Sequence, residues 1–129
     1  KAMQDNRSKG IYSKQIVKCV DYIQANLQQE LRLESIAEYL NMNPTYLSRL
    51  FKKEMDVSIS AYIKTERLKT AAHLLQYSNY SISEISEYLN FSSQSHFTSS
   101  FQELYGFTPK KYRDLHTSCE SPDLEEYES

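Results

Sequence analysis

The sequence writes one seven-residue phrase twice, as IAEYLNM at residues 36–42 and ISEYLNF at residues 85–91. The two copies lie 49 residues apart, and the apolar residues that follow them also correspond, at a shift of 50. The second turn is therefore one residue longer than the first. The later matched pairs are Leu47 with Phe97, Phe51 with Phe101, and Tyr62 with Tyr112. A repeat of this length in a chain of 129 residues predicts two copies of one structural unit.

Each copy has the order helix, tight turn, helix. A small residue, Ala37 or Ser86, stands in the first helix, where it lets a second helix approach closely. Four residues later comes Asn41 or Asn90, and asparagine tolerates the left-handed backbone of a sharp turn. This order is typical of the helix-turn-helix, whose second helix can lie in a DNA major groove. The alternative is a plain helical hairpin repeat, but solenoids usually need three or more repeats that follow one another directly.

Turn-forming residues are scarce, with only 2 Gly and 3 Pro, which favours helices over a β-sandwich or barrel. Apolar residues recur at helical spacing, so we expect an all-α fold with seven helices. The expected helices cover about 14–27, 33–40, 44–55, from Ser58 or Ser60 to about 76, 82–89, from Ser92 or Ser93 to about 105, and 109–115.

These helices predict two helix-turn-helix subdomains, at residues 12–57 and 78–116, joined by a long linker helix at residues 58–77. Residues 1–11 have the composition of a linker, and residues 117–129 form an acidic tail that is predicted to be disordered. A linker helix of about 18 residues is roughly 27 Å long. Successive major-groove segments on one DNA face lie roughly 34 Å apart. We therefore expect the linker helix to suit two recognition helices on one duplex.

Capping residues mark the expected helix ends. Residues 81–84, Ser-Ile-Ser-Glu, have the capping-box form S-x-x-E. The other expected N-caps are Ser13, Asn43 and Thr108. Gly106 is expected to end the sixth helix, whose buried side should hold Phe97, Phe101 and Leu104.

The net charge of −2 conceals an uneven distribution. Residues 117–129 contain five acidic residues and no Lys or Arg, so the rest of the chain is slightly basic. No apolar run approaches the roughly 20 residues of a membrane span, and no signal peptide is visible. The two cysteines, Cys19 and Cys119, form no CxxC pair and favour a reducing compartment. The expected localisation is therefore cytoplasmic.

The second half of the chain carries a long pattern made of Ile82, Ile85, Asn90-Phe91, Ser93, Ser95-His96-Phe97, Phe101, Gly106, Thr108-Pro109 and Tyr112-Arg113. Together with RLKTAAHLL (67–75) and LSRLFKKEMDVSISAYI (47–63), this pattern resembles the C-terminal DNA-binding domain of the AraC/XylS family of bacterial transcription regulators. The resemblance covers residues 12–116. It implies sequence-specific binding of double-stranded DNA by two recognition helices in successive major-groove segments. It also implies an upstream sensor, receiver or dimerisation region, with RNA polymerase as a further candidate partner.

The residues expected to contact bases lie on the two recognition helices. On the helix at 44–55, the groove-facing residues must avoid the apolar side, which leaves Thr45, Ser48 and Arg49. The family's base-contacting positions map onto these three and, on the second recognition helix, onto Gln94, Ser95, His96 and Ser99. We expect Arg49 to bond guanine O6 and N7 bidentately, and a glutamine such as Gln94 can read adenine N6 and N7.

Several of these residues have a structural alternative. Arg49 could instead form an ordinary surface ion pair, and His96 could be a partly buried filler beside the core. Tyr46 could stack on a sugar or simply pack. Arg67 is expected to have a structural role, tying its helix to a nearby carboxylate.

Phosphate contacts are expected from side chains and from helix N-termini. The amides of Leu33-Glu34 and of residues 110–111 can also bind phosphate. The side chains expected to contact phosphate are Lys52, Lys53, Lys110, Lys111 and Arg113. Lys52 and Lys53 could equally be a solvated helix face.

The chain departs from the family pattern at four positions. Asn41 and Asn90 stand where the family has a turn glycine, Asp56 stands where a glycine usually ends the first recognition helix, and Gln102 replaces a common lysine. The second recognition helix has no Lys or Arg at all. The alternative function is therefore a helical protein-interaction module without specific DNA binding. No nucleophile–base pairing, metal-ligand spacing or Gly-rich phosphate loop is found, so we expect no enzymatic activity, cofactor or metal.

Overall fold

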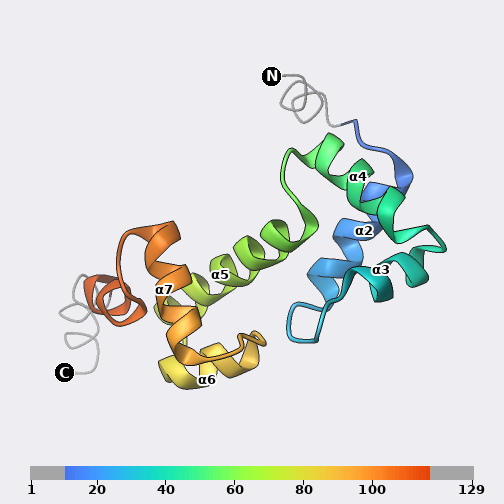
Figure 1. The fold of residues 1–129 in the computed structure, drawn as a ribbon. Helices are drawn as coiled ribbons and strands as arrows, with labels where there is room; N and C mark the ends of the chain where they lie inside the picture. Colours follow the sequence, from blue (N-terminus) through green and yellow to red (C-terminus); the bar gives the residue numbers. More distant parts are fainter. Residues whose placement is uncertain (1–10, 117–129) are drawn as a thin grey trace. The chain divides into compact units, whose positions relative to one another are not determined.

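The computed structural model describes residues 11–116 and contains seven helices and no strand in that range (Figure 1). The predicted all-α fold class is confirmed. The acidic tail predicted at residues 117–129 and all but the last residue of the predicted linker lie outside the described residues. The helices are α2 (Lys14–Ala25), α3 (Leu33–Leu40), α4 (Pro44–Met55), α5 (Ile59–Tyr77), α6 (Ile82–Tyr88), α7 (Gln94–Tyr105) and residues 109–116.

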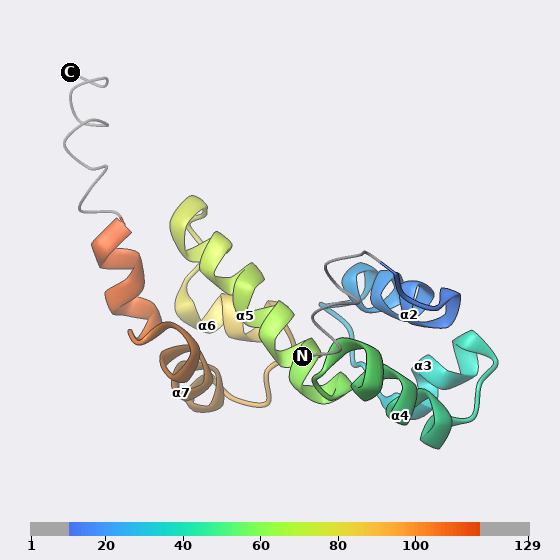
Figure 2. The ribbon, with the colours of Figure 1, turned by 90° about the horizontal axis from the view of Figure 1, so that it is seen from above.

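The chain divides into two compact units between Glu66 and Arg67, which lie within α5. In the first unit, α2, α3 and α4 pack against one another, as Figure 2 shows. The beginning of α5 completes that core through Ile59 and Ile63. The predicted linker helix is thus one continuous helix, but its first turns belong to the first core. The fully buried side chains of this unit are Ile16, Cys19, Ile23, Ile36, Leu47 and Phe51.

The second unit packs the remainder of α5 against α6 and α7. Phe101 is the centre of an aromatic cluster, with ring centroids 4.6 Å from Tyr105 and 5.2 Å from Tyr112. Aromatic pairs at such separations add to the stability that burial alone provides. The core members are Leu68, Ala71, Ala72, Leu75, Ile85, Leu89, Phe97 and Phe101.

The turns of the two units are closed in the same way. Asn41 and Asn90 adopt left-handed backbone, with φ of 60° and 63°, as predicted. The next amide, of Met42 or Phe91, bonds back to the carbonyl of Ala37 or Ser86 at 2.9 and 3.0 Å. These are the bonds of a Schellman motif, which satisfies carbonyls at a helix end.

The small residues are buried where the helices meet. Ala37 is 1% exposed and Ser86 is 4% exposed. Each lies on the supporting helix that packs against the following recognition helix, α3 against α4 and α6 against α7. A larger side chain at either position would need to displace a well-packed neighbour, which is typically destabilising.

Equivalent residues also cap the recognition helices. Asn43 Oδ1 accepts a hydrogen bond from the Tyr46 amide, and Ser93 Oγ accepts one from the His96 amide, both at 3.0 Å. The predicted cap Asn43 is confirmed, and Ser93 rather than Ser92 is the cap of α7. At their C-terminal ends the two helices reach left-handed residues 50 positions apart, Asp56 and Gly106.

The helix that follows each recognition helix is anchored identically. Ser58 Oγ accepts from the Ala61 amide at 3.1 Å. Thr108 Oγ1 accepts from the Lys111 amide at 3.2 Å. Ser58, rather than Ser60, therefore begins α5. The duplication thus includes the first turn of the helix after each recognition helix.

A tyrosine from this following helix contacts the recognition helix in each unit. The rings of Phe51 and Tyr62 meet edge-on with centroids 5.5 Å apart, and their equivalents at a shift of 50 meet edge-on at 5.2 Å. A glutamine amide donates to each tyrosine hydroxyl at 3.1 Å, Gln24 to Tyr62 and Gln76 to Tyr112. The end of α5 in the second unit therefore takes the place that α2 has in the first.

Two details of the predicted packing are wrong. Leu104 is 47% exposed, because Tyr105 stacks on Phe101 and fills that end of the core. Ser13 occupies the N-cap position of α2, but its side chain makes no capping hydrogen bond. Ser13 Oγ is buried with no partner among residues 11–116, while the Ser13 amide donates to Glu54 Oε1 at 2.9 Å.

Candidate nucleic-acid interface

One face of α4 is polar and open to solvent. Thr45 and Arg49 are exposed and Ser48 is half-buried, while Leu47 and Phe51 on the opposite side are fully buried. The helix begins with Pro at its first position behind the Asn43 cap, which fixes where the polar face starts. The three residues predicted to contact bases are therefore brought together on one solvent-facing surface.

Arg49 is available for a ligand. Within residues 11–116 no hydrogen bond or ion pair engages its guanidinium. The alternative of an ordinary surface ion pair is thus not supported by the structure. Tyr46, one turn earlier, is 55% exposed, so its side chain is accessible to a ligand.

Lys52 and Lys53 are exposed in the last turn of α4. Cations at this end of a helix interact favourably with the helix dipole, so these lysines also contribute to the stability of α4. Glu54 follows them but bonds the Ser13 amide. The predicted phosphate contacts therefore start from side chains that are solvated and directed away from the core.

The exposed face of α7 has no cation. Gln94, Ser95 and Ser99 are exposed, while Phe97 and Phe101 are fully buried. A shallow depression on this face is lined by Gln94, Ser95, Thr98, Ser99 and Gln102. The site prediction did not include Thr98 and Gln102, although their spacing of three and seven residues from Ser95 places them on the same side of a helix.

His96 is exposed and lies at the edge of the second core. Its ring meets that of Phe91 edge-on, with centroids 5.9 Å apart, and Nδ1 is 3.4 Å from Ser92 Oγ. The interpretation of His96 as a partly buried filler is wrong, because Phe91 rather than His96 covers Phe97. The side chain is therefore open to a base or phosphate.

Lys110 and Lys111 lie in the first turn of the helix at residues 109–116. Lys110 Nζ is 3.1 Å from Asp114 Oδ2, and both side chains are largely exposed. Exposed ion pairs of this kind contribute little to stability, so a phosphate can compete with Asp114. Lys111 has no ion pair among residues 11–116. Both cations also face the positive end of their helix, which favours an anionic ligand.

The structure places Arg113 at the end of α5 rather than on the open surface. Its Nε donates to the Leu75 carbonyl at 3.0 Å, and one terminal nitrogen donates to the carbonyls of Ser78 and Leu74 at 3.2 and 3.5 Å. The Leu75 carbonyl lies in the last turn of α5, where helix carbonyls lack partners within the helix. The phosphate contact predicted for Arg113 thus has no geometric support, and the side chain acts as a helix cap.

Arg67 is half-buried within α5. Burial lowers the pKa of its guanidinium, since the charged form loses solvent. The contact with a nearby carboxylate that the sequence suggests for Arg67 stays a prediction.

The N-terminus of α3 has no side-chain cap. Arg32 stands at the N-cap position and pairs with Glu30 at 2.8 Å, a contact that raises the pKa of the guanidinium. The amides of the first turn therefore lack a side-chain cap, and Glu34 places a negative charge in that turn. The phosphate contact at Leu33-Glu34 stays a prediction.

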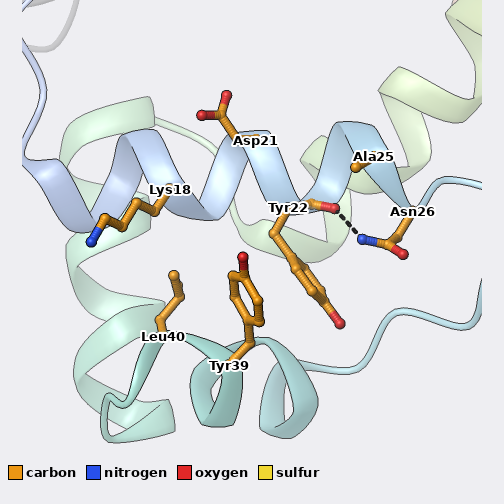
Figure 3. Close-up of a pocket in the computed structure, with 7 residues that line it drawn as sticks. All are labelled: Lys18, Asp21, Tyr22, Ala25, Asn26, Tyr39 and Leu40. Atoms are coloured by element: carbon orange, nitrogen blue, oxygen red, sulfur yellow. Dashed lines mark hydrogen bonds between the residues drawn. The ribbon is translucent and has the colours of Figure 1, made fainter.

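A surface pocket lies between α2 and α3, as Figure 3 shows. The rings of Tyr22 and Tyr39 face each other there with centroids 4.4 Å apart, and Asn26 Nδ2 donates to the Tyr22 carbonyl at 2.8 Å. The pocket brings no nucleophile to a general base and contains no residue predicted to contact DNA. Its lining consists of Lys18, Asp21, Tyr22, Ala25, Asn26, Tyr39 and Leu40.

Between residues 11 and 116, no three His, Cys, Asp or Glu side chains gather as metal ligands. No helix in that range is long and apolar enough to cross a membrane.

Two helix-turn-helix units, each with a polar exposed face on its second helix, define a sequence-specific DNA-binding domain of the kind found in bacterial transcription regulators. A family model described as a helix-turn-helix domain matches residues 36–114. The chain belongs to the AraC family of transcription regulators. The family is not enzymatic, in agreement with the prediction.

Three relatives illustrate the similarity. Regulatory protein PocR of Salmonella typhimurium is 36% identical over 108 residues, which cover 83% of this chain and 36% of PocR. The multiple antibiotic resistance protein MarA of Escherichia coli is 33% identical over 102 residues, covering 79% of this chain and 80% of MarA. The solved C-terminal domain of AraT, a response regulator from Geobacillus stearothermophilus, superposes with a TM-score of 0.76 at 36% identity, covering 80% of this chain and 86% of that one. This chain thus spans only about a third of PocR.

Proposed function

We propose that this chain is the C-terminal output domain of a bacterial regulator and that α4 and α7 enter successive major-groove segments of one DNA duplex. A sensor, receiver or dimerisation region would precede it. Two relatives support this placement. The AraT domain is the C-terminal part of a response regulator, and this chain matches 36% of the regulatory protein PocR.

The duplicated unit carries the proposal. Turn, caps and the Phe–Tyr–Gln contact recur at shifts of 49 to 52 residues, so each recognition helix is held by equivalent contacts. A helix fixed in this way presents its polar face as a rigid surface, which base readout requires. The same scaffold with two different polar faces suits an operator with two different half-sites.

Base readout on α4 is assigned to Thr45, Ser48 and Arg49. Arg49 has no partner among residues 11–116 and can bond guanine O6 and N7 bidentately. Thr45 and Ser48 can bond any of several base edges. On α7 the assigned residues are Gln94, Ser95, His96 and Ser99.

Phosphate contacts are assigned to Lys52, Lys53, Lys110 and Lys111. All four are exposed. They position the domain and supply affinity that does not depend on sequence. Because Arg113 caps α5, we leave it out of this set.

A domain with this role works where the chromosome is, in the cytoplasm. RNA polymerase is the further partner that a regulator bound at an operator can contact. Both statements follow from the proposed role.

The test is duplex binding measured at several salt concentrations with a labelled DNA of random sequence and with duplexes selected from a random pool. If each lysine contacts one phosphate, log K should fall with log salt with a slope of roughly −3 to −4. Selection should enrich one motif with two half-sites. A chain that binds no duplex at low salt would overturn the proposal, and binding without enrichment of any motif would overturn its sequence specificity.

A further inference from the structure

The two recognition helices differ in charge at equivalent positions. α4 has three cations on or beside its exposed face, whereas the only residue of α7 that is charged at neutral pH, histidine aside, is Glu103. Every cation of α4 has a neutral or acidic counterpart in α7. The substituted pairs, at a shift of 50, are Arg49 with Ser99, Lys52 with Gln102, and Lys53 with Glu103.

The face that replaces these cations consists of amides and hydroxyls. The depression on α7 is lined by five neutral side chains. Ser99 Oγ donates to the Ser95 carbonyl at 3.1 Å, so this hydroxyl is engaged within the helix. The side-chain amides of Gln94 and Gln102 are exposed and make no hydrogen bond within residues 11–116. Their donors and acceptors are therefore open to a ligand.

We propose that α7 is a neutral recognition helix that reads an adenine-containing segment of DNA through Gln94. Its binding would displace almost no counterions from the DNA phosphates. The assignment rests on the proposed function. A glutamine amide matches adenine, which offers an acceptor at N7 and a donor at N6. Guanine offers two acceptors, which an Arg or Lys reads best, and α7 has neither.

By the same reasoning, Gln102 is assigned to a contact with the phosphate backbone of the DNA. Its equivalent Lys52 is one of the proposed phosphate contacts, and Gln102 can bond a phosphate only as a neutral donor. The salt-dependent part of the affinity for DNA then comes from α4 and from the helix at residues 109–116. The contribution of α7 is to discriminate between bases. The operator should consequently pair a guanine-containing half-site for α4 with an adenine-containing half-site for α7.

The base preference is tested with Gln94→Ala and the matched variant Gln102→Ala, which changes the same residue type on the same helix. Motifs selected from random duplex DNA are compared with the wild-type motif. Gln94→Ala should lose the preference for adenine at one position, and Gln102→Ala should keep it. A guanine preference throughout the α7 half-site, or a motif that Gln94→Ala leaves unchanged, would overturn the assignment.

The charge partition is tested by salt titration of Gln102→Lys and Lys52→Gln. Gln102→Lys should steepen the salt slope by about 0.9 and strengthen binding to all sequences alike. Lys52→Gln should flatten the slope by a similar amount. An unchanged slope in both variants would contradict the partition while leaving duplex binding in place. Wild-type chain that binds no duplex would instead overturn the proposed function itself.

Discussion

Single residues at the turns decide whether each recognition helix is aimed correctly. Asn41 and Asn90 hold φ near +60°, a region that is costly for residues with a Cβ and least so for asparagine and aspartate. Asp56 takes the same conformation at the end of α4, with φ of 67°. Sequence predicts these turns well, because the residue types that tolerate them are few.

Asn41→Ala should destabilise the fold, since alanine in the left-handed region costs about 1–2 kcal/mol relative to glycine. Asn41→Gly should be neutral or slightly stabilising for the same reason. Urea unfolding of both variants measures the difference in unfolding free energy. Asn79→Ala, an exposed asparagine without positive φ, is the control. Equal stability of Asn41→Ala and Asn41→Gly would show that the turn does not depend on this conformation.

Cys19 is a second residue with a measurable signature. Burial raises the pKa of its thiol from 9.0 to about 11. The folded state holds this proton more tightly than the unfolded state, so the resulting stability is complete below about pH 9 and is lost as pH rises through about 11. The unfolding free energy of the wild type should therefore fall over this window more steeply than that of Cys19→Ala. Parallel pH profiles for the two proteins would rule out a buried thiol.

Arg113 shows what sequence cannot resolve at this scale. Its position beside two lysines predicted a phosphate contact, yet its partners are carbonyls 35 to 39 residues away. Side-chain type identifies a cation, but only tertiary structure shows which acceptor reaches it first.

At the scale of elements, the sequence predicts where a helix starts when its N-cap side chain bonds an amide in the first turn of the same helix. Asn43, Ser58, Ser81, Ser93 and Thr108 all accept from an amide three residues on. Ser13 is the exception, because the Ile16 amide donates to the Ser13 carbonyl at 3.1 Å and the Ser13 side chain makes no capping bond. The bond from the Ser13 amide to Glu54 of α4 is a long-range contact that no pattern around residue 13 indicates.

The capping box of α6 makes a prediction at this scale. Ser81 Oγ accepts from the Glu84 amide at 3.0 Å, and Glu84 Oε1 accepts from the Ser81 amide at 2.7 Å. Ser81→Ala should lower the unfolding free energy by about 1 kcal/mol. Ser83→Ala, an exposed position within the same helix, should change it by less than about 0.5 kcal/mol. Similar effects of the two changes in chemical denaturation would mean that the box does not stabilise α6.

At the scale of the whole molecule, the repeat in the sequence is a repeat of tertiary contacts. The edge-on pairs Phe51–Tyr62 and Phe101–Tyr112, with their glutamine donors, could be anticipated only in part. The Phe and Tyr positions follow from the alignment of the two halves. The glutamines do not, because α2 and the end of α5 share no comparable motif.

Each unit has its own core, so a substitution in one core should destabilise that unit more than the other. Phe101→Leu should destabilise the second unit by about 1–2 kcal/mol through lost aromatic packing. Amide hydrogen exchange should lose more protection in residues 67–116 than in residues 11–66. Phe107→Leu, at a position that is 42% exposed, is the matched control. Equal losses across both units would show that the two cores unfold as one.

The central claim is that exposed side chains on this duplicated scaffold read DNA bases while lysines bind phosphates. The most direct measurement is the affinity of wild type, Arg49→Ala and Lys111→Ala for the selected duplex and for each of its single-base-pair variants. Arg49→Ala should lose about 1–3 kcal/mol of discrimination at one base pair and leave the other positions unchanged. Lys111→Ala should weaken binding to every duplex alike and flatten the salt slope by about 0.9. Equal, small effects of both variants on all sequences would contradict the account.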